Sequence, residues 1–232
     1  WQTKAIADGG QRIPEGVTYE QALSVFGVTG LTAYVGLADI GKPKPGETVV
    51  VSGAAGGVGS IAGQIAKLQG CRVVGIAGSP EKCRWVTEDL GFDECIDYRA
   101  ESIADGLRRT CPDGIDVYFD NVGGETLNEV LARINNFARI ILCGAISQYN
   151  TGEPAPGPAN IINAISRRAL LQGFIILDHM DRAPEAMQAM GGWISKGELQ
   201  VRTHVLEGLD SAPQALLDLF TGANLGKTLV RL

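Results

Sequence analysis

The chain contains 232 residues, of which 45% are apolar and 20% are charged, so it can fold around a substantial hydrophobic core. These values exclude a disulfide-stapled miniprotein, a disordered tail and a coiled coil. Lys and Arg number 20 against 26 Asp and Glu, which gives a formal net charge of −6. Because this balance leaves no general basic surface to neutralise a nucleic-acid backbone, we expect no nucleic-acid partner.

Glycine is abundant, with 31 residues, which predicts many tight turns and close approaches of the backbone. Residues 49–66 carry no charge and are long enough to suggest a membrane span, but this stretch contains five glycines. Because so many glycines would break up a spanning helix, we expect no membrane partner.

Cysteines are spread along the chain, and no two of them are closer than twelve residues. They are Cys71, Cys83, Cys95, Cys111 and Cys143. This spacing excludes the C-x-x-C pair of a metal knuckle or a redox couple. Because their number is odd and most of them lie in apolar runs, we expect reduced thiols and a cytoplasmic protein.

In chain order, two short helices at 20–26 and 31–38 are predicted first, and strand-like runs then alternate with helix-like runs. We predict six strands, at 48–52, 72–77, 94–97, 115–119, 138–143 and 170–176. We predict five connecting helices, at 58–68, 81–90, 102–110, 125–134 and 159–167. Six strands joined by helical crossovers predict an α/β fold, a doubly wound parallel six-stranded Rossmann sheet.

The last part of the chain fits poorly onto a finished six-stranded sheet. It contains a predicted helix at 184–195, a polar strand at 200–205, a helix at 212–221 and an edge strand at 227–232. We therefore expect a dinucleotide-binding domain at 26–197, with residues 1–25 and 198–232 belonging to a second domain. The chain begins at Trp1 rather than at methionine, and we expect it to be part of a longer protein.

A glycine-rich turn follows the first predicted strand and precedes the first predicted connecting helix. Read as G-x-G-x-x-G, its three positions are Ala54, Gly56 and Gly59, so the first departs from the pattern. Gly56 would let the backbone reach a pyrophosphate, and Gly59 would let helix and strand pack closely. A glycine-rich turn that binds no ligand is the alternative, but the position between strand and helix favours a dinucleotide.

The end of the second predicted strand indicates which dinucleotide is bound. A protein that prefers NAD usually carries Asp or Glu there, about twenty residues beyond the fingerprint, to bind the ribose 2′-hydroxyl. Here residues 75–79 contain no carboxylate, and Lys82 follows one turn into the next helix. Because this environment would accept a 2′-phosphate, we predict NADP(H) as the cofactor. The alternative for Lys82 is an ordinary solvated helix lysine.

Two common mechanisms of nicotinamide enzymes find little support in the sequence. Short-chain dehydrogenases use a Tyr-x-x-x-Lys pair, and none of the five tyrosines has a lysine four residues later. A catalytic zinc needs Cys and His ligands, but the chain contains only His179 and His204 and no cysteine before Cys71. We therefore predict no metal site.

Several separated motifs carry a resemblance to one family. They lie at 29–34, 54–59, 63–67, 119–124, 143–150 and 224–227. The chain resembles the zinc-independent medium-chain dehydrogenase/reductases, within them the NADPH-dependent alkenal and enone reductases of the leukotriene B4 dehydrogenase/prostaglandin reductase and bacterial curcumin reductase group. This resemblance implies that residues 1–25 and 198–232 are remnants of a GroES-like, β-rich substrate domain. It also implies a homodimer joined through the sheet edge near residues 170–176.

The resemblance implies reduction of a carbon–carbon double bond conjugated to the carbonyl of an aldehyde or ketone, with hydride transfer from NADPH to the β carbon. Two alternatives stay open: an NADPH quinone oxidoreductase, against which the stretch 144–150 argues, and a module that binds NADPH without turnover. The substrate itself is not fixed by the sequence, because part of its pocket would come from the loop 150–160.

The resemblance also implies roles for individual residues. Those expected at the pyrophosphate are Gly56, Gly57, Val58 and Gly59, and those expected at the 2′-phosphate are Lys82 and Tyr98. Those expected around the riboses and the nicotinamide are Asn121, Cys143, Gly144, Ala145, Ile146, Ser147, Gln148, Tyr149, Phe174, Ile175, Ile176 and Asn224.

Tyr149 is the expected catalytic residue, because a phenol can donate a hydrogen bond to an enolate oxygen or pass on a proton. The alternatives are a contact with a cofactor ribose, or a buried tyrosine whose hydroxyl is merely satisfied. Asp120, at the end of a predicted strand, is expected to cap a turn rather than to act as an acid.

Overall fold

A computed structural model describes residues 2, 4, 12–150, 152 and 156–232. Within these residues, six parallel strands form one sheet in the spatial order β3-β2-β1-β4-β5-β6. The strands are β1 Thr48–Ser52, β2 Arg72–Ala77, β3 Glu94–Asp97, β4 Ile115–Asp120, β5 Ile134–Leu142 and β6 Leu170–Gly173. The strand order reverses between β1 and β4, so the predicted doubly wound Rossmann sheet is confirmed.

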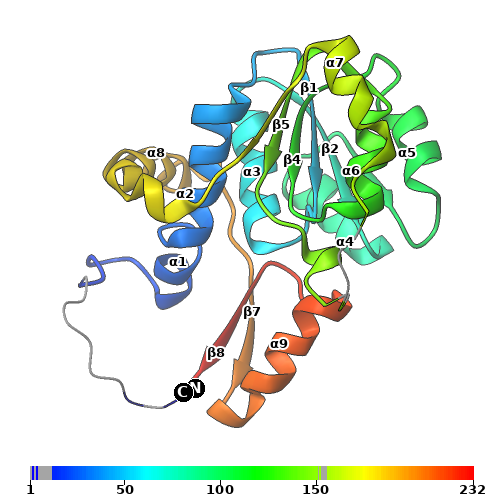
Figure 1. The fold of residues 1–232 in the computed structure, drawn as a ribbon. Helices are drawn as coiled ribbons and strands as arrows, with labels where there is room; N and C mark the ends of the chain where they lie inside the picture. Colours follow the sequence, from blue (N-terminus) through cyan, green and yellow to red (C-terminus); the bar gives the residue numbers. More distant parts are fainter. Residues whose placement is uncertain (1, 3, 5–11, 151, 153–155) are drawn as a thin grey trace.

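Helices cover both faces of this sheet (Figure 1). The α-helices in the described part of the chain are α1 Tyr19–Leu23, α2 Val28–Val35, α3 Gly57–Leu68, α4 Pro80–Arg84, α5 Ile103–Thr110, α6 Gly124–Leu131, α7 Asn163–Arg167, α8 Ala183–Ser195 and α9 Ala212–Thr221. Short π-helical and 3₁₀ turns lie between them: η1 Gly36–Gly41, η2 Trp85–Asp89, η3 Ile146–Gln148, η4 Ala159–Ile162, η5 Ile176–Arg182 and η6 Leu209–Ser211.

The alternation of side chains along β1 explains why both faces need a cover. Val49 and Val51 belong to the core cluster that includes α2, α3 and α8, whereas Val50 belongs to the cluster that includes α5 and α6. All three side chains are fully buried. A strand that is apolar on both faces needs helices on both sides of its sheet. The strand β1 therefore lies in the middle of the sheet, and its carboxyl end lies between those of β2 and β4.

A second, smaller unit follows the large sheet. The strands β7 (Thr203–Glu207) and β8 (Lys227–Arg231) pair in parallel, with α9 between them in the chain and beside them in space (Figure 1). A β-bridge between Gly56 and Gly226 connects the start of β8 to the turn after β1. The described part of the predicted remnant 1–25 contains α1 and no strand, and residues 1, 3 and 5–11 lie outside the described residues.

The bounds of β5 and β6 differ from the sequence prediction. The strand predicted at 138–143 begins at Ile134, so the preceding helix, predicted to reach residue 134, ends at Leu131. The strand predicted at 170–176 ends at Gly173, because its neighbour β5 ends at Leu142, the residue paired with Gly173. Pairing with a neighbour, rather than hydrophobicity, therefore determines where these two strands begin and end.

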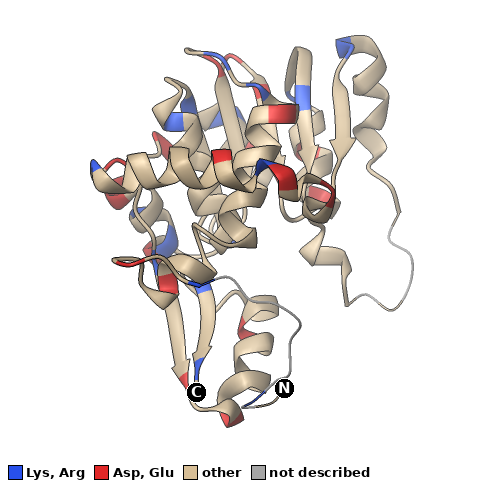
Figure 2. Cartoon of the chain, turned by 90° about the vertical axis from the view of Figure 1, so that its left-hand side faces the viewer, with Lys and Arg blue, Asp and Glu red and all other residues tan. Residues whose placement is uncertain are grey.

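Acidic and basic residues are interspersed along the helices and loops of the chain (Figure 2). Lys67 at the end of α3 forms an ion pair with Asp93, with 2.8 Å between Nζ and Oδ2. Arg139 of β5 forms an ion pair with Glu47, and its Nε donates to the carbonyl of Gly41 at 2.8 Å. These contacts fasten the loops at the amino-terminal edge of the sheet, away from the glycine-rich turn.

The close packing of α3 against the loop before β3 yields a stability prediction. A Cβ on Gly63 would lie 1.8 Å from Cζ of Phe92, a fully buried ring. We expect Gly63→Ala to lower the free energy of unfolding by about 3 kcal/mol, because the ring has no free space to enter. The measurement is urea unfolding of both proteins at equal concentration.

The matched control is Gly192→Ala in α8, where a Cβ would meet no atom within 4 Å. This change should raise the free energy of unfolding by about 0.5–1 kcal/mol, because alanine loses less backbone entropy on folding. Equal effects of the two substitutions would contradict the packing argument.

Candidate cofactor site

The turn between β1 and α3 has the geometry of an anion-binding loop. Gly53 adopts a φ of 58°, and a Cβ on Gly59 would lie 2.4 Å from the carbonyl oxygen of Gly53. Both positions therefore require glycine. The first turn of α3 presents the backbone N–H groups of Gly57, Val58 and Gly59, which have no acceptor within the helix. Such a helix start can bind a diphosphate.

The segment before β8 lies against this turn. The N–H of Gly226 donates to the carbonyl of Ala55 at 2.8 Å, and a Cβ on Gly57 would lie 3.3 Å from Cδ of Lys227. Asn224 is buried, and its side-chain amide donates to the carbonyl of Gly226 at 3.1 Å. The structure thus brings the predicted residue Asn224 to the glycine-rich turn from the far end of the chain.

The end of β4 is organised by one buried carboxyl group. Oδ1 of Asp120 accepts hydrogen bonds from the hydroxyls of Tyr118 (2.8 Å) and Ser52 (3.1 Å). The same oxygen accepts from the backbone N–H groups of Val122 (3.0 Å) and Gly123 (2.9 Å). Burial raises the pKa of the Tyr118 phenol well above its usual value, so this hydroxyl stays a donor. The predicted role of Asp120 in holding a turn is confirmed.

Asn121 is tied to the end of β1 by two hydrogen bonds. Its backbone N–H donates to Oγ of Ser52 at 2.9 Å, and its side-chain Nδ2 donates to the carbonyl of Ser52 at 2.8 Å. The side chain is therefore held at the carboxyl edge of the sheet, beside the glycine-rich turn. Its predicted hydrogen bond to a cofactor ribose or phosphate stays a prediction.

The segment after β5 runs alongside the turn after β4. Cys143 and Gly144 both donate their N–H groups to the carbonyl of Asp120, at 2.9 and 3.0 Å. Further along, Ile146 donates to the carbonyl of Asn121, and the hydroxyl of Ser147 donates to the carbonyl of Val122 at 2.6 Å. Ala145 and Gln148 belong to the same segment, which lies at the carboxyl ends of β4 and β5. The predicted contacts of these residues with the nicotinamide half of a cofactor stay a prediction.

Tyr149 lies at the end of this segment and is 62% exposed, so the alternative of a buried tyrosine is wrong. Its hydroxyl oxygen accepts a hydrogen bond from the N–H of Ala145 at 3.0 Å. Because the oxygen accepts this bond, the hydroxyl hydrogen remains able to donate to another group.

The residues after β6 reach the same edge, since Gly173 pairs with Leu142. Phe174 and Ile176 are half-buried against the core, whereas Ile175 is exposed. Ile176 begins a 3₁₀ turn, so the predicted continuous strand over these three residues is wrong. The chain bends there because no neighbouring strand continues, which turns residues 174–176 away from the sheet plane.

The predicted 2′-phosphate residues meet at the end of β2. A Cβ on Gly78 would lie 2.5 Å from the hydroxyl of Tyr98, so this ring stands directly beside the strand end. Ser79 caps α4 by accepting from the N–H of Lys82 at 3.2 Å. The sequence analysis missed Arg99, the residue after Tyr98, which lies next to Lys82. The signal available in the sequence was a basic residue shortly after β3, the strand next to β2.

The described residues contain no group of three or more His, Cys, Asp and Glu side chains that could hold a metal ion. No helix among the elements described above is long and apolar enough to cross a membrane.

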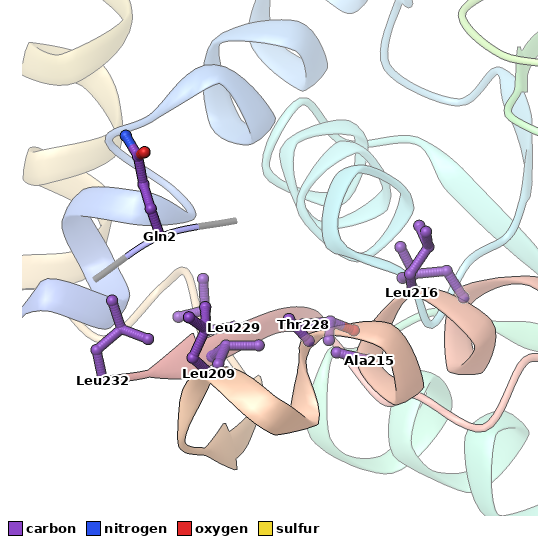
Figure 3. A pocket seen from close by; sticks show the side chains of 10 residues that line it. Gln2, Leu209, Ala215, Leu216, Thr228, Leu229 and Leu232 are labelled. Carbon is purple, nitrogen blue, oxygen red and sulfur yellow. The ribbon is translucent and has the colours of Figure 1, made fainter. Parts of the chain in front are cut away.

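An apolar pocket of about 330 Å³ lies in the smaller unit and includes none of the predicted cofactor residues. Figure 3 shows Ala215 and Leu216 of α9 and Thr228 and Leu229 of β8 at its wall. The pocket therefore belongs to the surface formed by α9 and β8 rather than to the edge of the large sheet.

Comparison with known proteins places this architecture in a family. The sequence model described as zinc-binding dehydrogenase matches residues 57–192, more than half of the chain. The chain belongs to this family. The expected membership in the enone reductase group of the medium-chain dehydrogenase/reductases is also confirmed, because the relatives of this chain include a curcumin reductase and prostaglandin reductases.

Three curated relatives illustrate the match. The putative NADP-dependent oxidoreductase YfmJ of Bacillus subtilis (strain 168) is 51% identical, over 90% of this chain and 62% of its own length. The NADPH-dependent curcumin reductase of Escherichia coli (strain K12) is 44% identical, over 100% of this chain and 69% of its own length. Prostaglandin reductase 1 of Mus musculus is 44% identical, over 100% and 72%. The chain thus spans about two thirds of the length of these relatives.

Among solved structures, this chain is more similar to CurA than to quinone oxidoreductases. CurA from Vibrio vulnificus in complex with NADPH superposes with a TM-score of 0.87 at 46% identity, over 91% of this chain and 64% of that chain. A quinone oxidoreductase from Pseudomonas syringae pv. Tomato DC3000 superposes with a TM-score of 0.80 at 25% identity, over 96% and 67%. Quinone oxidoreductases are therefore more distant relatives than CurA.

The burial of Cys143 at the candidate site yields a prediction of reactivity. Burial, with a smaller contribution from Asp120, raises the pKa of its thiol to about 12. Since the thiolate is the reactive form, we expect alkylation of Cys143 at pH 8.5 to be at least about 100-fold slower in the native protein than in urea, where the thiol pKa returns to about 8.5. Mass spectrometry after timed iodoacetamide labelling measures both rates. Similar rates would contradict the raised pKa of the Cys143 thiol in the folded protein.

Proposed function

We propose that the chain binds NADPH and that the complete protein uses it to reduce the carbon–carbon double bond of α,β-unsaturated aldehydes and ketones. The observation that carries the cofactor proposal is the end of β2, which lacks a carboxylate and has Lys82 and Tyr98 beside it. An acidic residue there would repel a 2′-phosphate, whereas an ammonium attracts it. The NADPH complex of CurA supports the same cofactor.

The arrangement of the carboxyl edge fits an extended dinucleotide. The N–H groups at the start of α3, from Gly57 to Gly59, would bind the diphosphate next to Gly56. Asn121 and the residues Cys143 to Tyr149 would lie under the nicotinamide half, because they follow β4 and β5 on the other side of β1. Residues 174–176 and Asn224 would close the site from β6 and from the segment before β8.

The chemistry needs a donor near the substrate carbonyl. When bound, NADPH would supply a hydride to the β carbon of the substrate, and the π electrons of the double bond would move toward the carbonyl oxygen to give an enolate. The exposed hydroxyl of Tyr149 would donate a hydrogen bond to the enolate oxygen, and its own oxygen would keep the bond from the N–H of Ala145. The α carbon would then take a proton from solvent water, which gives the saturated aldehyde or ketone. We propose this phenol, rather than a zinc ion, as the group that polarises the carbonyl.

We further propose the domain arrangement 26–197 for cofactor binding, with 1–25 and 198–232 as remnants of a GroES-like substrate domain. Exposed apolar side chains support this proposal on both segments, with Tyr19 and Leu23 on α1 and Leu217 and Phe220 on α9. The apolar pocket shown in Figure 3, lined by other residues of α9 and by β8, adds exposed apolar surface to the second segment. Such a surface is unfavourable in water unless another part of a protein covers it.

A homodimer in the cytoplasm completes the proposal. Within the described sheet, β6 pairs only with β5, and its outer edge carries Leu170, which is 46% exposed. An open apolar strand edge favours pairing with another strand, and a second copy of the chain offers the same edge. The five free cysteines support a reducing compartment.

A substrate panel tests the proposed reaction on the complete gene product. We expect NADPH-dependent turnover of 2-alkenals or enones with kcat/KM at least about 100-fold above that of benzoquinones, because the barrier difference between matched and unmatched acceptors is typically a few kcal/mol. Activity should survive dialysis against a zinc chelator. Preferred turnover of quinones would support the quinone oxidoreductase alternative, and tight NADPH binding without turnover of any acceptor would support a binding module.

Tyr149→Phe separates the two remaining roles of this residue. If the hydroxyl donates to the enolate oxygen, kcat on an enone should fall by about 100-fold, with the NADPH dissociation constant nearly unchanged. A weaker affinity for NADPH with unchanged kcat would instead identify a ribose contact. Tyr19→Phe is the matched control, because this exposed phenol lies on α1 and should change neither quantity.

A further inference from the structure

Two basic side chains from different elements converge at the carboxyl end of α9. Nζ of Lys82 donates to the carbonyl of Gly222 at 2.7 Å, and Nη2 of Arg99 donates to the carbonyl of Thr221 at 2.9 Å. A Cβ built on Gly222 would lie 3.7 Å from the first nitrogen and 3.9 Å from the second. The two cationic groups are therefore close neighbours.

Their electrostatic environment favours an additional anion. Burial lowers the pKa of the Lys82 ammonium, and the nearby charge of Arg99 lowers it further. Among the ion pairs of the described residues, none joins a carboxylate to either side chain. The two carbonyls at the negative end of the α9 dipole are their hydrogen-bond acceptors, and they compensate only part of two positive charges.

Most of the donors of this pair are not used by α9. An ammonium has three N–H donors and a guanidinium five, and the two hydrogen bonds to α9 use one nitrogen of each side chain. Arg99 also lies with Cζ 6.0 Å from the centre of the Tyr98 ring, the ring that stands beside Gly78 at the end of β2. The remaining donors are therefore next to the strand end where this fold binds the adenosine ribose.

We propose that Arg99 is a second cationic ligand of the NADPH 2′-phosphate, acting together with Lys82, and that the last carbonyls of α9 position both side chains. A phosphate monoester carries close to two negative charges, which matches the two cations, and a guanidinium can bind two of its oxygens at once. This inference rests on the proposed NADPH-binding function and adds to it the residue that determines the preference for the phosphorylated cofactor.

The segment that follows α9 leads from the two cations to the glycine-rich turn. The chain leaves α9 at Thr221 and reaches Gly226, whose N–H donates to Ala55 in the glycine-rich turn. The short segment 221–226 thus contacts the two cations at one end and the diphosphate-binding turn at the other. It fixes the distance between the two phosphate sites that one NADPH molecule would occupy.

Isothermal titration calorimetry on the complete gene product tests the proposal, with NADPH and NADH as separate ligands. We expect Arg99→Gln to raise the dissociation constant for NADPH by about 10-fold or more and to leave that for NADH within about twofold. Arg99→Lys should recover part of the loss, since it restores the charge without the planar fork. Unchanged NADH binding also shows that the variant is folded.

The matched control is Arg84→Gln, which removes the same charge from an exposed side chain at the end of α4. It should leave both dissociation constants unchanged, so a general electrostatic effect is distinguished from a direct contact. If the wild-type protein prefers NADPH and Arg99→Gln keeps the same preference, the role of Arg99 is wrong. If the wild-type protein binds NADPH and NADH equally, the proposed cofactor is wrong instead.

Discussion

A single oxygen, Oδ1 of Asp120, joins the two halves of the sheet at the place where their strand order reverses. It accepts hydrogen bonds from Ser52 at the end of β1 and from Tyr118 and two backbone N–H groups at the end of β4. With 1% exposure, the carboxyl group has no water to replace these donors. The turns after β1 and β4 are therefore held in one arrangement, and the segment after β5 is built onto it, since Cys143 and Gly144 donate to the carbonyl of the same aspartate.

The smaller unit depends on the large sheet in a complementary way. A two-stranded sheet with one helix buries little apolar surface, and such a unit is marginally stable by itself in water. Its described attachments include the β-bridge of Gly226 with the glycine-rich turn and the hydrogen bonds from Lys82 and Arg99 to the end of α9. These two attachments lie at the proposed phosphate positions, so the cofactor site contributes to the orientation of β7, α9 and β8.

The sequence was sufficient where local rules decide the structure. Ala54, Gly56 and Gly59 could be interpreted because a strand, a tight turn and a helix start follow one another within a few residues. The sequence was insufficient where residues far apart in the chain determine the structure by contacting one another. The ends of β5 and β6 follow their pairing with each other, and Arg99 is marked by the carbonyl of Thr221, 122 residues further along the chain. The exposure of Tyr149 and its bond from Ala145 likewise depend on how η3 turns back, which residue types alone do not specify.

The bridge of Gly226 to the glycine-rich turn and the hydrogen bonds of Lys82 and Arg99 to the end of α9 link cofactor binding to the stability of the smaller unit. A ligand that binds the folded arrangement but not the unfolded chain stabilises every contact on which its site depends. A dinucleotide in the proposed site would touch the glycine-rich turn and the cations that hold the end of α9, so its binding would favour the docked orientation of β7 and β8. The helix α9, which lies beside these strands, carries exposed apolar side chains proposed to pack on the rest of the substrate domain. Cofactor binding would therefore also stabilise that proposed packing, without any direct contact between the cofactor and the rest of that domain.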